Sequence, residues 1–332
     1  MLQFFFALLK IPSVLTKKYF QFLLLIIFAG CFSRQDKSVP VIGFLDFMQD
    51  ETLAQAKNGF MDALEEEGFS EKNKTIDIIY RNAQGDQPSL VQACDYLISK
   101  NVVLIATNPT LSTITAVQKT KDIPIFMMVS PRPDLAGLTD KNGNAPQNLF
   151  GTYETLSYID TSLLLIKTVF PSAKKIGTIF NQSEPQSVDA LNEIKSACNK
   201  TGFELLSYPV NSSNETQLIV QALLDKKIDA FFALPDNVVF TSMEVIVSSC
   251  DAAHVPVFTS EEGLVKRGAL AAYGADMYKW GYQSGRQAVV YLKQKSTEGL
   301  QPEIVEARRK VYNASKAVEY HVKFDGTYTG IH

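Results

Sequence analysis

The order of strand-like and helix-like segments occurs twice along the chain, and this repeat constrains the fold more than any other feature. Short apolar runs alternate with amphipathic segments of helical periodicity, and the same alternation returns from Lys175. Corresponding glycines share one offset: Gly43 and Gly177 lie 134 residues apart, as do Gly68 and Gly202. Strands that alternate with helices are typical of parallel α/β layers. The sequence therefore predicts two copies of one α/β half.

The periodicity gives the expected elements of each half. In the first half we expect strands over 41–46, 75–80, 102–106 and 123–129, with helices over 53–67, 89–100 and 110–121. In the second half we expect strands over 175–180, 203–208, 230–233 and 257–259, with helices over 187–201, 215–225 and 239–253. A strand over 270–272 and a helix from Asp276 follow.

The connections between the halves predict a clamshell. Residues 130–172 join the two halves, and the chain after residue 273 returns to the first half. This gives an α/β fold of two similar lobes, each a parallel sheet flanked by helices, which can close over a ligand by a hinge motion. We expect lobe 1 over 39–150 plus about 274–312, and lobe 2 over about 151–273 plus about 313–332.

The amino terminus carries a targeting pattern. An apolar run over 19–29 follows Lys17 and Lys18, and as a helix it spans about 16 Å, which is too short for a bilayer core of about 30 Å. Its length is that of a signal-peptide core. The run ends in Phe28-Ala29-Gly30-Cys31, which resembles a bacterial lipobox except that Phe28 stands where leucine is usual.

This pattern predicts a lipid-anchored protein. We expect a lipoprotein signal peptide over 1–30, lipidation of Cys31 and a tether over 31–38. The protein would then lie outside the cytoplasm on a bacterial membrane, in the periplasm or on the cell surface. A plain secretory signal and an uncleaved anchor are the alternatives.

Charge and the reactive residue types exclude several classes. The chain has 32 Lys and Arg against 35 Asp and Glu, without basic blocks, so we expect no nucleic-acid partner. Cys94, Cys198 and Cys250 fall in helix-like stretches without a CxxC pair, which predicts buried thiols rather than disulfides. The three histidines have no metal-ligand spacing, and the chain lacks GxGxxG and GxSxG motifs. We therefore expect no metal, no cofactor and no enzyme activity.

Polar residues gather where the expected strands end, which is where parallel sheets bind ligands. The candidate ligand-binding residues are Phe47, Gln49, Thr107, Asn108, Thr110, Ser130, Asn181, Ser183, Asp236, Asn237, Glu261 and Asp276.

The chemistry of these candidates suits an α-amino acid. The helix terminus at 107–110 favours an anion such as a carboxylate. Asp236, together with Glu261 or Asp276, can neutralise an ammonium group, and Phe47 can supply an apolar wall. Other interpretations remain open: Asp236 and Asp276 can simply cap helices, Phe47 can belong to the core, and Glu261 can be solvated.

Several motifs resemble one family along the whole mature chain. The runs Asn82-Ala83-Gln84-Gly85-Asp86 and Pro235-Asp236-Asn237 are the most specific. On these residues the chain resembles the bacterial ABC-transporter substrate-binding lipoproteins of the tryptophan/tyrosine-uptake type. The resemblance implies a type I periplasmic-binding-protein fold, no catalysis, and delivery of a small molecule to an ABC permease and its ATPase. It implies an aromatic or apolar amino acid as the ligand, with tryptophan first, and a monomer.

Two segments depart from the family pattern. Many relatives read Gln-Phe and then Glu-His-Pro after the first strand, whereas this chain has Asp46-Phe47 and then Gln49-Asp50-Glu51. The run 130–134 is one residue longer than usual. The pocket for the ligand side chain can therefore differ from that of relatives. A receptor that presents its closed form to a membrane signalling partner is the alternative function, and an enzyme is a more remote one.

Overall fold

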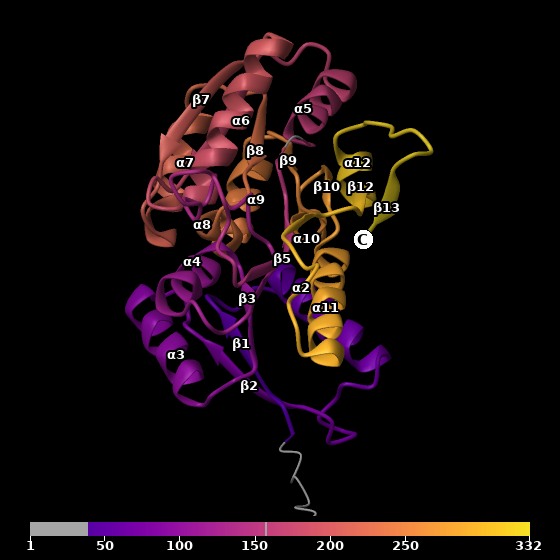
Figure 1. Ribbon diagram of the computed structural model, residues 1–332. Helices are drawn as coiled ribbons and strands as arrows, with labels where there is room; N and C mark the ends of the chain where they lie inside the picture. Colours follow the sequence, from indigo (N-terminus) through magenta and orange to yellow (C-terminus); the bar gives the residue numbers. More distant parts are fainter. Residues whose placement is uncertain (1–38, 157) are drawn as a thin grey trace, which may run out of the picture. The chain divides into compact units, whose positions relative to one another are not determined.

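The computed structural model of this 332-residue chain describes residues 39–156 and 158–332 (Figure 1). The expected signal peptide, tether and lipidated Cys31 lie outside the described residues. Within the described part, no helix is long and apolar enough to cross a membrane. The thiols of Cys94, Cys198 and Cys250 are free and buried, which confirms their expected place in the core.

The unit over 40–332 contains two sheets, one in each lobe (Figure 1). The lobe 1 sheet has the order β11-β5-β4-β3-β1-β2 and pairs in parallel throughout. Its strands are β1 (Val41–Asp46), β2 (Asp77–Asn82), β3 (Leu104–Asn108), β4 (Ile125–Met127), β5 (Leu149–Tyr153) and β11 (Glu303–Ile304). Its helices are α2 (Glu51–Glu66), α3 (Gln87–Ser99), α4 (Thr110–Lys119) and α11 (Met277–Gln294).

The lobe 2 sheet has the order β13-β12-β10-β9-β8-β6-β7, and only the β10–β12 pair in it is antiparallel among the described residues. Its strands are β6 (Lys175–Phe180), β7 (Glu204–Pro209), β8 (Ala230–Ala233), β9 (Val257–Thr259), β10 (Ala271–Ala275), β12 (Arg308–Asn313) and β13 (Thr329–Ile331). Its helices are α5 (Tyr158–Val169), α6 (Pro185–Thr201), η1 (Ser213–Glu215), α7 (Thr216–Leu224), α8 (Asn237–Thr241), α9 (Met243–Ala252), α10 (Glu262–Lys266) and α12 (Ala314–Glu319).

Burial explains why the central strands are almost wholly apolar. Every residue of β3 and β8 is buried, because helices cover both faces of each sheet. In lobe 1, Phe44 of β1 is fully buried and meets Phe60 of α2 edge to face, with ring centroids 5.9 Å apart. These contacts fix the strand ends in space, and the candidate site is built on those ends.

Two glycines let α11 return to lobe 1 and pack closely on α2, as Figure 1 shows. A Cβ atom at Gly59 would lie 2.0 Å from the Tyr278 carbonyl oxygen, and one at Gly281 would lie 1.7 Å from that of Ala56. Only glycine allows the two backbones to approach this closely. The return of the chain to lobe 1, expected from the sequence, therefore depends on this helix pair.

Some expected elements differ from those observed. The helix expected over 239–253 is two helices, α8 and α9, because the chain turns at Ser242, whose N–H still bonds to Val238 and Val239. Strand β12 lies in the lobe 2 sheet, so the chain crosses to lobe 2 near residues 305–307, earlier than the boundary expected near 312. The crossing segments after β5, after β10 and before β12 join the lobes.

Candidate ligand-binding site

Two adjoining cavities lie between the lobes, at the carboxyl ends of the strands. The inner cavity has a volume of about 30 Å³ and is lined by residues that include Thr110, Ser130, Glu154, Asn237, Glu261 and Trp280. The outer cavity has a volume of about 760 Å³ and is lined by residues that include Phe47, Gln49, Gln84, Asn181, Asn211 and Arg267. Asn237 and Phe240 line both, so the two cavities share a wall.

The inner cavity gathers buried polar atoms that lack hydrogen-bond partners. These atoms are Glu154 Oε2, Tyr158 Oη, Gln186 Oε1, Asn237 Nδ2 and Glu261 Oε2. An unsatisfied buried polar group costs about 1–3 kcal/mol, so proteins rarely leave several together without a use for them. Three of the five atoms, those of Glu154, Gln186 and Glu261, are carbonyl or carboxyl oxygens that accept hydrogen bonds. The cavity is therefore suited to a ligand that donates hydrogen bonds.

The carboxyl group of Glu261 is fully buried next to other acidic groups. Burial raises its pKa well above the usual value, and the charge of Glu154 adds to this, while the Ser260 hydroxyl opposes the shift. Burial, followed by the charges of Glu261 and Glu154, also raises the pKa of the Tyr158 phenol. The empty cavity therefore favours a protonated Glu261, and a bound cation would favour its carboxylate form.

Aromatic and apolar groups complete the inner cavity. Trp280 of α11 is only 3% exposed, and its Nε1 donates a hydrogen bond of 2.9 Å to the Thr152 carbonyl oxygen. The Thr152 hydroxyl in turn donates to the Trp280 carbonyl oxygen at 3.1 Å. This exchange fixes the indole ring against β5. Phe240 lies at the wall that the two cavities share.

Two residues beside the inner cavity have a strained backbone. Val129, after β4, has φ of 51°, and Leu156, just before α5, has φ of 61°. A positive φ is costly for branched and bulky side chains, above all for β-branched valine. Such strain concentrates at functional sites, where the surrounding structure holds it in place. Leu156 lies on the segment that crosses to lobe 2 after β5, whereas Val129 lies at the carboxyl end of β4 within lobe 1.

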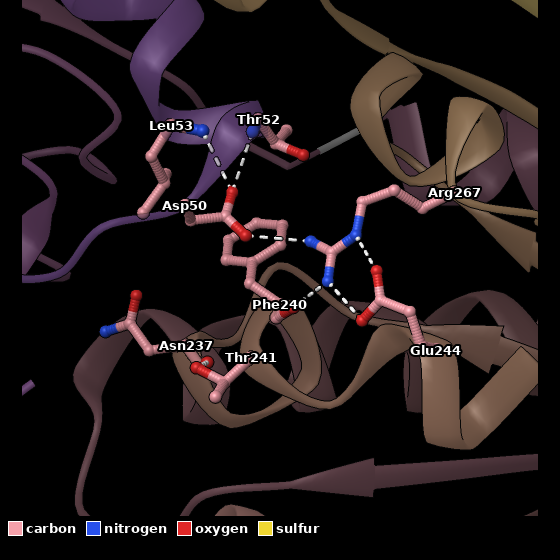
Figure 2. Close-up of polar contacts among 8 residues, drawn as sticks. All are labelled: Asp50, Thr52, Leu53, Asn237, Phe240, Thr241, Glu244 and Arg267. Carbon is pink, nitrogen blue, oxygen red and sulfur yellow. Dashed lines mark hydrogen bonds and ion pairs between the residues drawn. The ribbon is translucent and has the colours of Figure 1, made fainter.

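The rim of the outer cavity holds an ion pair between the lobes (Figure 2). Arg267 of lobe 2 donates from Nη1 to Asp50 Oδ2 of lobe 1 at 2.7 Å, and from Nε to Glu244 Oε1 at 2.8 Å. Its Nη2 donates to the Phe240 carbonyl oxygen at 2.7 Å. The other oxygen of Asp50 caps α2 by accepting from the Thr52 and Leu53 N–H groups. This network joins the lobes in the described conformation.

The structure distributes the candidate residues over four places. The inner cavity includes Thr110, Ser130, Asn237 and Glu261. The outer cavity includes Phe47, Gln49, Asn181 and Ser183, with Asn237 shared. Thr107, Asn108 and Asp236 are buried behind these walls. Asp276 lines a separate cavity of about 180 Å³, together with Arg309.

Asp236 caps a helix, which is the alternative to ligand binding that the sequence left open for it. Its Oδ1 accepts from the Val238 and Val239 N–H groups at the start of α8. Its Oδ2 accepts from the Asn181 N–H at 2.7 Å and from the Ser187 hydroxyl. Both oxygens are thus occupied, which leaves Glu261 as the candidate with an oxygen free for an ammonium group.

Asn108 and Thr107 also bond within the protein. Asn108 Nδ2 donates to Asp46 Oδ1 at 3.0 Å and to the Leu53 carbonyl oxygen at 3.1 Å, which ties β3 to β1 and α2. Burial raises the pKa of Asp46 to about 7. The Thr107 hydroxyl bonds to that of Thr113. Of the expected anion site at 107–110, only the start of α4 faces the inner cavity. This helix start has no side-chain cap.

Asp276 caps α11 by accepting from the Lys279 N–H, and it lies 4.0 Å from Arg309. It is therefore not brought to either cavity of the cleft.

Sequence reasoning missed Glu154, Tyr158, Gln186 and Trp280 as site residues. Glu154 and Tyr158 fall in the segment over 130–172, which the sequence predicts to be a connection between the halves. The single tryptophan of the chain was a usable signal, because it lies on the helix that returns to lobe 1. The position of Gln186 gives no local signal.

Comparisons with known proteins agree on one family. The family model described as ABC transporter substrate binding protein matches residues 41–327. A tyrosine-binding protein from Clostridioides difficile (strain R20291) is 35% identical over 255 residues, or 77% of this chain and 73% of that protein.

Solved structures confirm the clamshell fold. The ABC domain in complex with L-Trp from Streptococcus pneumoniae matches with a TM-score of 0.79 at 25% identity, over 87% of this chain and 97% of that chain. The ligand-free, open structure of a substrate binding protein with adhesive properties from Clostridium difficile matches with a TM-score of 0.67 at 29% identity. That match covers 88% of this chain and 99% of that chain.

Proposed function

The chain belongs to the family of ABC transporter substrate-binding proteins, and we propose that it delivers an aromatic or apolar amino acid, tryptophan or tyrosine first, to an ABC importer. Members of this family are not enzymes and work outside the cytoplasm. The observation that carries the proposal is the inner cavity, where five unpartnered polar atoms from both lobes meet. Relatives that bind tyrosine or hold L-Trp support the choice of amino acid.

The head group of the amino acid binds between the two lobes. The uncapped start of α4, with the hydroxyls of Thr110 and Ser130, receives the carboxylate, because a helix amino terminus favours an anion. The free oxygen of Glu261 receives the ammonium group. Each end of the head group thus contacts a different lobe.

The aromatic side chain extends past Phe240 toward the outer cavity. A volume of about 30 Å³ holds about two water molecules, which is too little for a whole amino acid. Phe240 and Trp280 offer ring faces for stacking beside the head group. The side chain then lies at the boundary of the two cavities, near Gln49, which departs from the pattern of relatives.

Binding proceeds by closure of the clamshell. The lobe-to-lobe pair of Arg267 with Asp50 supports a closed form, since this contact needs both lobes. The closer match to the L-Trp complex than to the ligand-free, open structure, despite lower identity, supports the same interpretation. A ligand that contacts both lobes shifts the equilibrium toward the closed form.

The permease, its ATPase and the lipid anchor complete the proposal. Cys31 carries the lipid that holds the protein at the membrane, and the closed form is presented to the permease. Changing Cys31→Ser should release the protein from membranes and leave ligand affinity unchanged. Membrane retention of that variant would argue for an uncleaved anchor.

Thermal unfolding against amino acids, nucleosides and sugars tests the proposed ligand class. Residues 40–332 form one unit, so a fragment from Ser33 onward retains both cavities. A ligand at a hundred times its Kd stabilises by about 2.7 kcal/mol. At about 2–4 °C per kcal/mol, the expected shift is several degrees with tryptophan, tyrosine or phenylalanine. A shift with sugars or nucleosides alone would refute the amino-acid proposal.

A further inference from the structure

Glu154 occupies an unusual position on the segment that leaves lobe 1. It follows β5 directly, and its N–H donates to the Ser130 carbonyl oxygen at 3.0 Å. Its side chain is completely buried. Oε1 accepts from Arg308 Nη2 at 2.9 Å and from the Thr155 N–H at 2.7 Å. Oε2 is equally buried, has no partner and belongs to the inner cavity.

The charges around the inner cavity do not balance. Glu154 and Glu261 both line it, and each has one free oxygen. Across the described residues, no Lys, Arg or His lines this cavity. Arg308 bonds to Oε1 of Glu154, and the free oxygen is Oε2. Two carboxyl groups therefore face the cavity, and one cation of the protein compensates them.

We infer that Glu154 is a second ligand-binding carboxylate, and that Glu154 and Glu261 together select ligands that carry a cationic amine. The inference rests on the proposed function, because it deepens the recognition of the amino group at the same site. An ammonium group has three N–H donors and no acceptor, so it can donate to both free oxygens at once. A deaminated ligand would leave both oxygens unsatisfied in a buried site.

The position of Glu154 also links the amine to the crossing segments. Glu154 lies on the first crossing segment, and Arg308 begins β12 just after the last one. An amine that binds Oε2 thus contacts Glu154, which lies on the first crossing segment and is joined to the last one through Arg308. Glu261, by contrast, lies at the end of β9 in lobe 2. One ligand group therefore engages a lobe and the hinge together.

Calorimetry on the protein from Ser33 onward tests the inference with defined probes. The probes are L-tyrosine and L-tryptophan, the amines tyramine and tryptamine, and the deaminated acids 3-(4-hydroxyphenyl)propionate and indole-3-propionate. We expect wild-type protein to bind the deaminated acids at least about a hundredfold more weakly than the matching amino acids. Glu154→Gln keeps the shape and an acceptor for Arg308, and it should weaken amino-acid binding more than tenfold.

Glu262→Gln is the matched control. Glu262 is the neighbour of Glu261 but pairs with Lys266 and Arg309 outside the inner cavity. Its replacement should change amino-acid affinity less than twofold. Should Glu154→Gln fail to fold, equal binding of amino acids and deaminated acids by wild-type protein would still overturn the inference.

The possible results separate the two proposals. Unchanged amino-acid affinity in Glu154→Gln overturns the inference and leaves the proposed function standing. Binding of tyramine or tryptamine but no amino acid, weakened in Glu154→Gln, overturns the amino-acid proposal and supports the inference. Equal binding of amino acids and deaminated acids overturns the inference alone. Wild-type protein that binds none of the six probes counts against both.

Discussion

The charged groups of the inner and outer cavities differ in whether they have partners within the protein. In the outer cavity, Arg267 bonds to Asp50, Glu244 and the Phe240 carbonyl oxygen, so its charge is matched within the protein. In the inner cavity, Glu154 and Glu261 each keep an oxygen without a partner. A matched network can hold two lobes together, whereas unmatched buried acceptors are costly until a ligand arrives. The difference separates residues that hold the closed form from residues that bind.

Replacing Glu261 tests the binding side of this comparison and should have the largest effect. Glu261→Gln removes the negative charge that faces the ammonium group and places a donor there. Losing a buried charge partner costs on the order of 2–5 kcal/mol, so affinity for tyrosine or tryptophan should fall by about a hundredfold. Calorimetry measures the loss. An affinity within threefold of wild type would mean that the amine binds elsewhere.

Asp236 should affect stability first, because its oxygens serve the protein itself. Asp236→Ala leaves the N–H groups of Asn181, Val238 and Val239 without their acceptor. We expect the free energy of unfolding to fall by about 2–4 kcal/mol, measured by urea denaturation. Asp236→Asn, which keeps a capping oxygen, should lose less. Full stability with lost ligand affinity would restore the ligand role expected from the sequence.

The affinity for an amino acid should rise with pH. The raised pKa of Glu261 means that the empty protein holds a proton there, and a bound ammonium group must displace it. Below this raised pKa, each pH unit upward should increase affinity by at most about tenfold, while the ligand amine stays protonated. Calorimetry from pH 5 to 7.5 measures the slope, and Glu261→Gln should flatten it. A slope of opposite sign would exclude proton release at this group.

The stability of the ligand-free protein should fall with pH, in contrast to its affinity for an amino acid. Asp46 and Glu184 have pKa values raised to about 7 and about 8, mainly by burial. A carboxyl group whose pKa is higher in the folded state stabilises the protein when protonated, and this contribution is lost as pH rises through the folded pKa. The melting temperature of ligand-free protein should therefore fall between pH 5 and pH 8. A melting temperature that rises over this range would contradict these shifts.

Asp50 tests the outer network and should have the smallest effect. Asp50→Asn keeps an oxygen that can cap α2 but removes the charge that pairs with Arg267 (Figure 2). We expect about a three- to tenfold lower ligand affinity, because the closed form becomes less populated. X-ray scattering of the ligand-free protein should show a larger radius of gyration.

Asp86→Asn is the matched control for Asp50. Asp86 caps α3 through the Ser89 N–H and is exposed, without a partner in lobe 2 in the described structure. It should leave both affinity and radius of gyration unchanged. If the two variants behave alike, the ion pair of Arg267 does not control closure.

Most of the fold could be predicted from the sequence. The bounds of β1, β6, β8 and β9 agree with the expected strands, because each is a short and mainly apolar run. Asp276 was expected at a helix start, and it caps α11. The residues next to the crossing segments could not be predicted as well. Residues 149–153 form β5 within a Gly- and Asn-rich stretch, where pairing with β4 decides the conformation.

For the site, the rule of strand ends selected residues that line both cavities, among them Thr110, Ser130, Asn237 and Glu261. It gave no means of ranking them, because each follows a strand in the same way. The rule did not select Glu154, because the sequence predicts no strand in the segment over 130–172 that contains it. Local sequence patterns predict where strands end. They do not predict which residues from distant segments come into contact at those ends.

The sequence by itself determined two α/β lobes, the order of their elements and the sheet edge at which a ligand would bind. Only the tertiary structure decided which carboxylates keep a free oxygen. Asp236 and Glu261 both follow buried strands of lobe 2, yet Asn181 and Ser187, about fifty residues away, reach Asp236 and occupy it. Glu261 accepts from the hydroxyl of its neighbour Ser260 and retains one oxygen without a partner. Donors supplied by distant segments make this difference, and no local pattern records them.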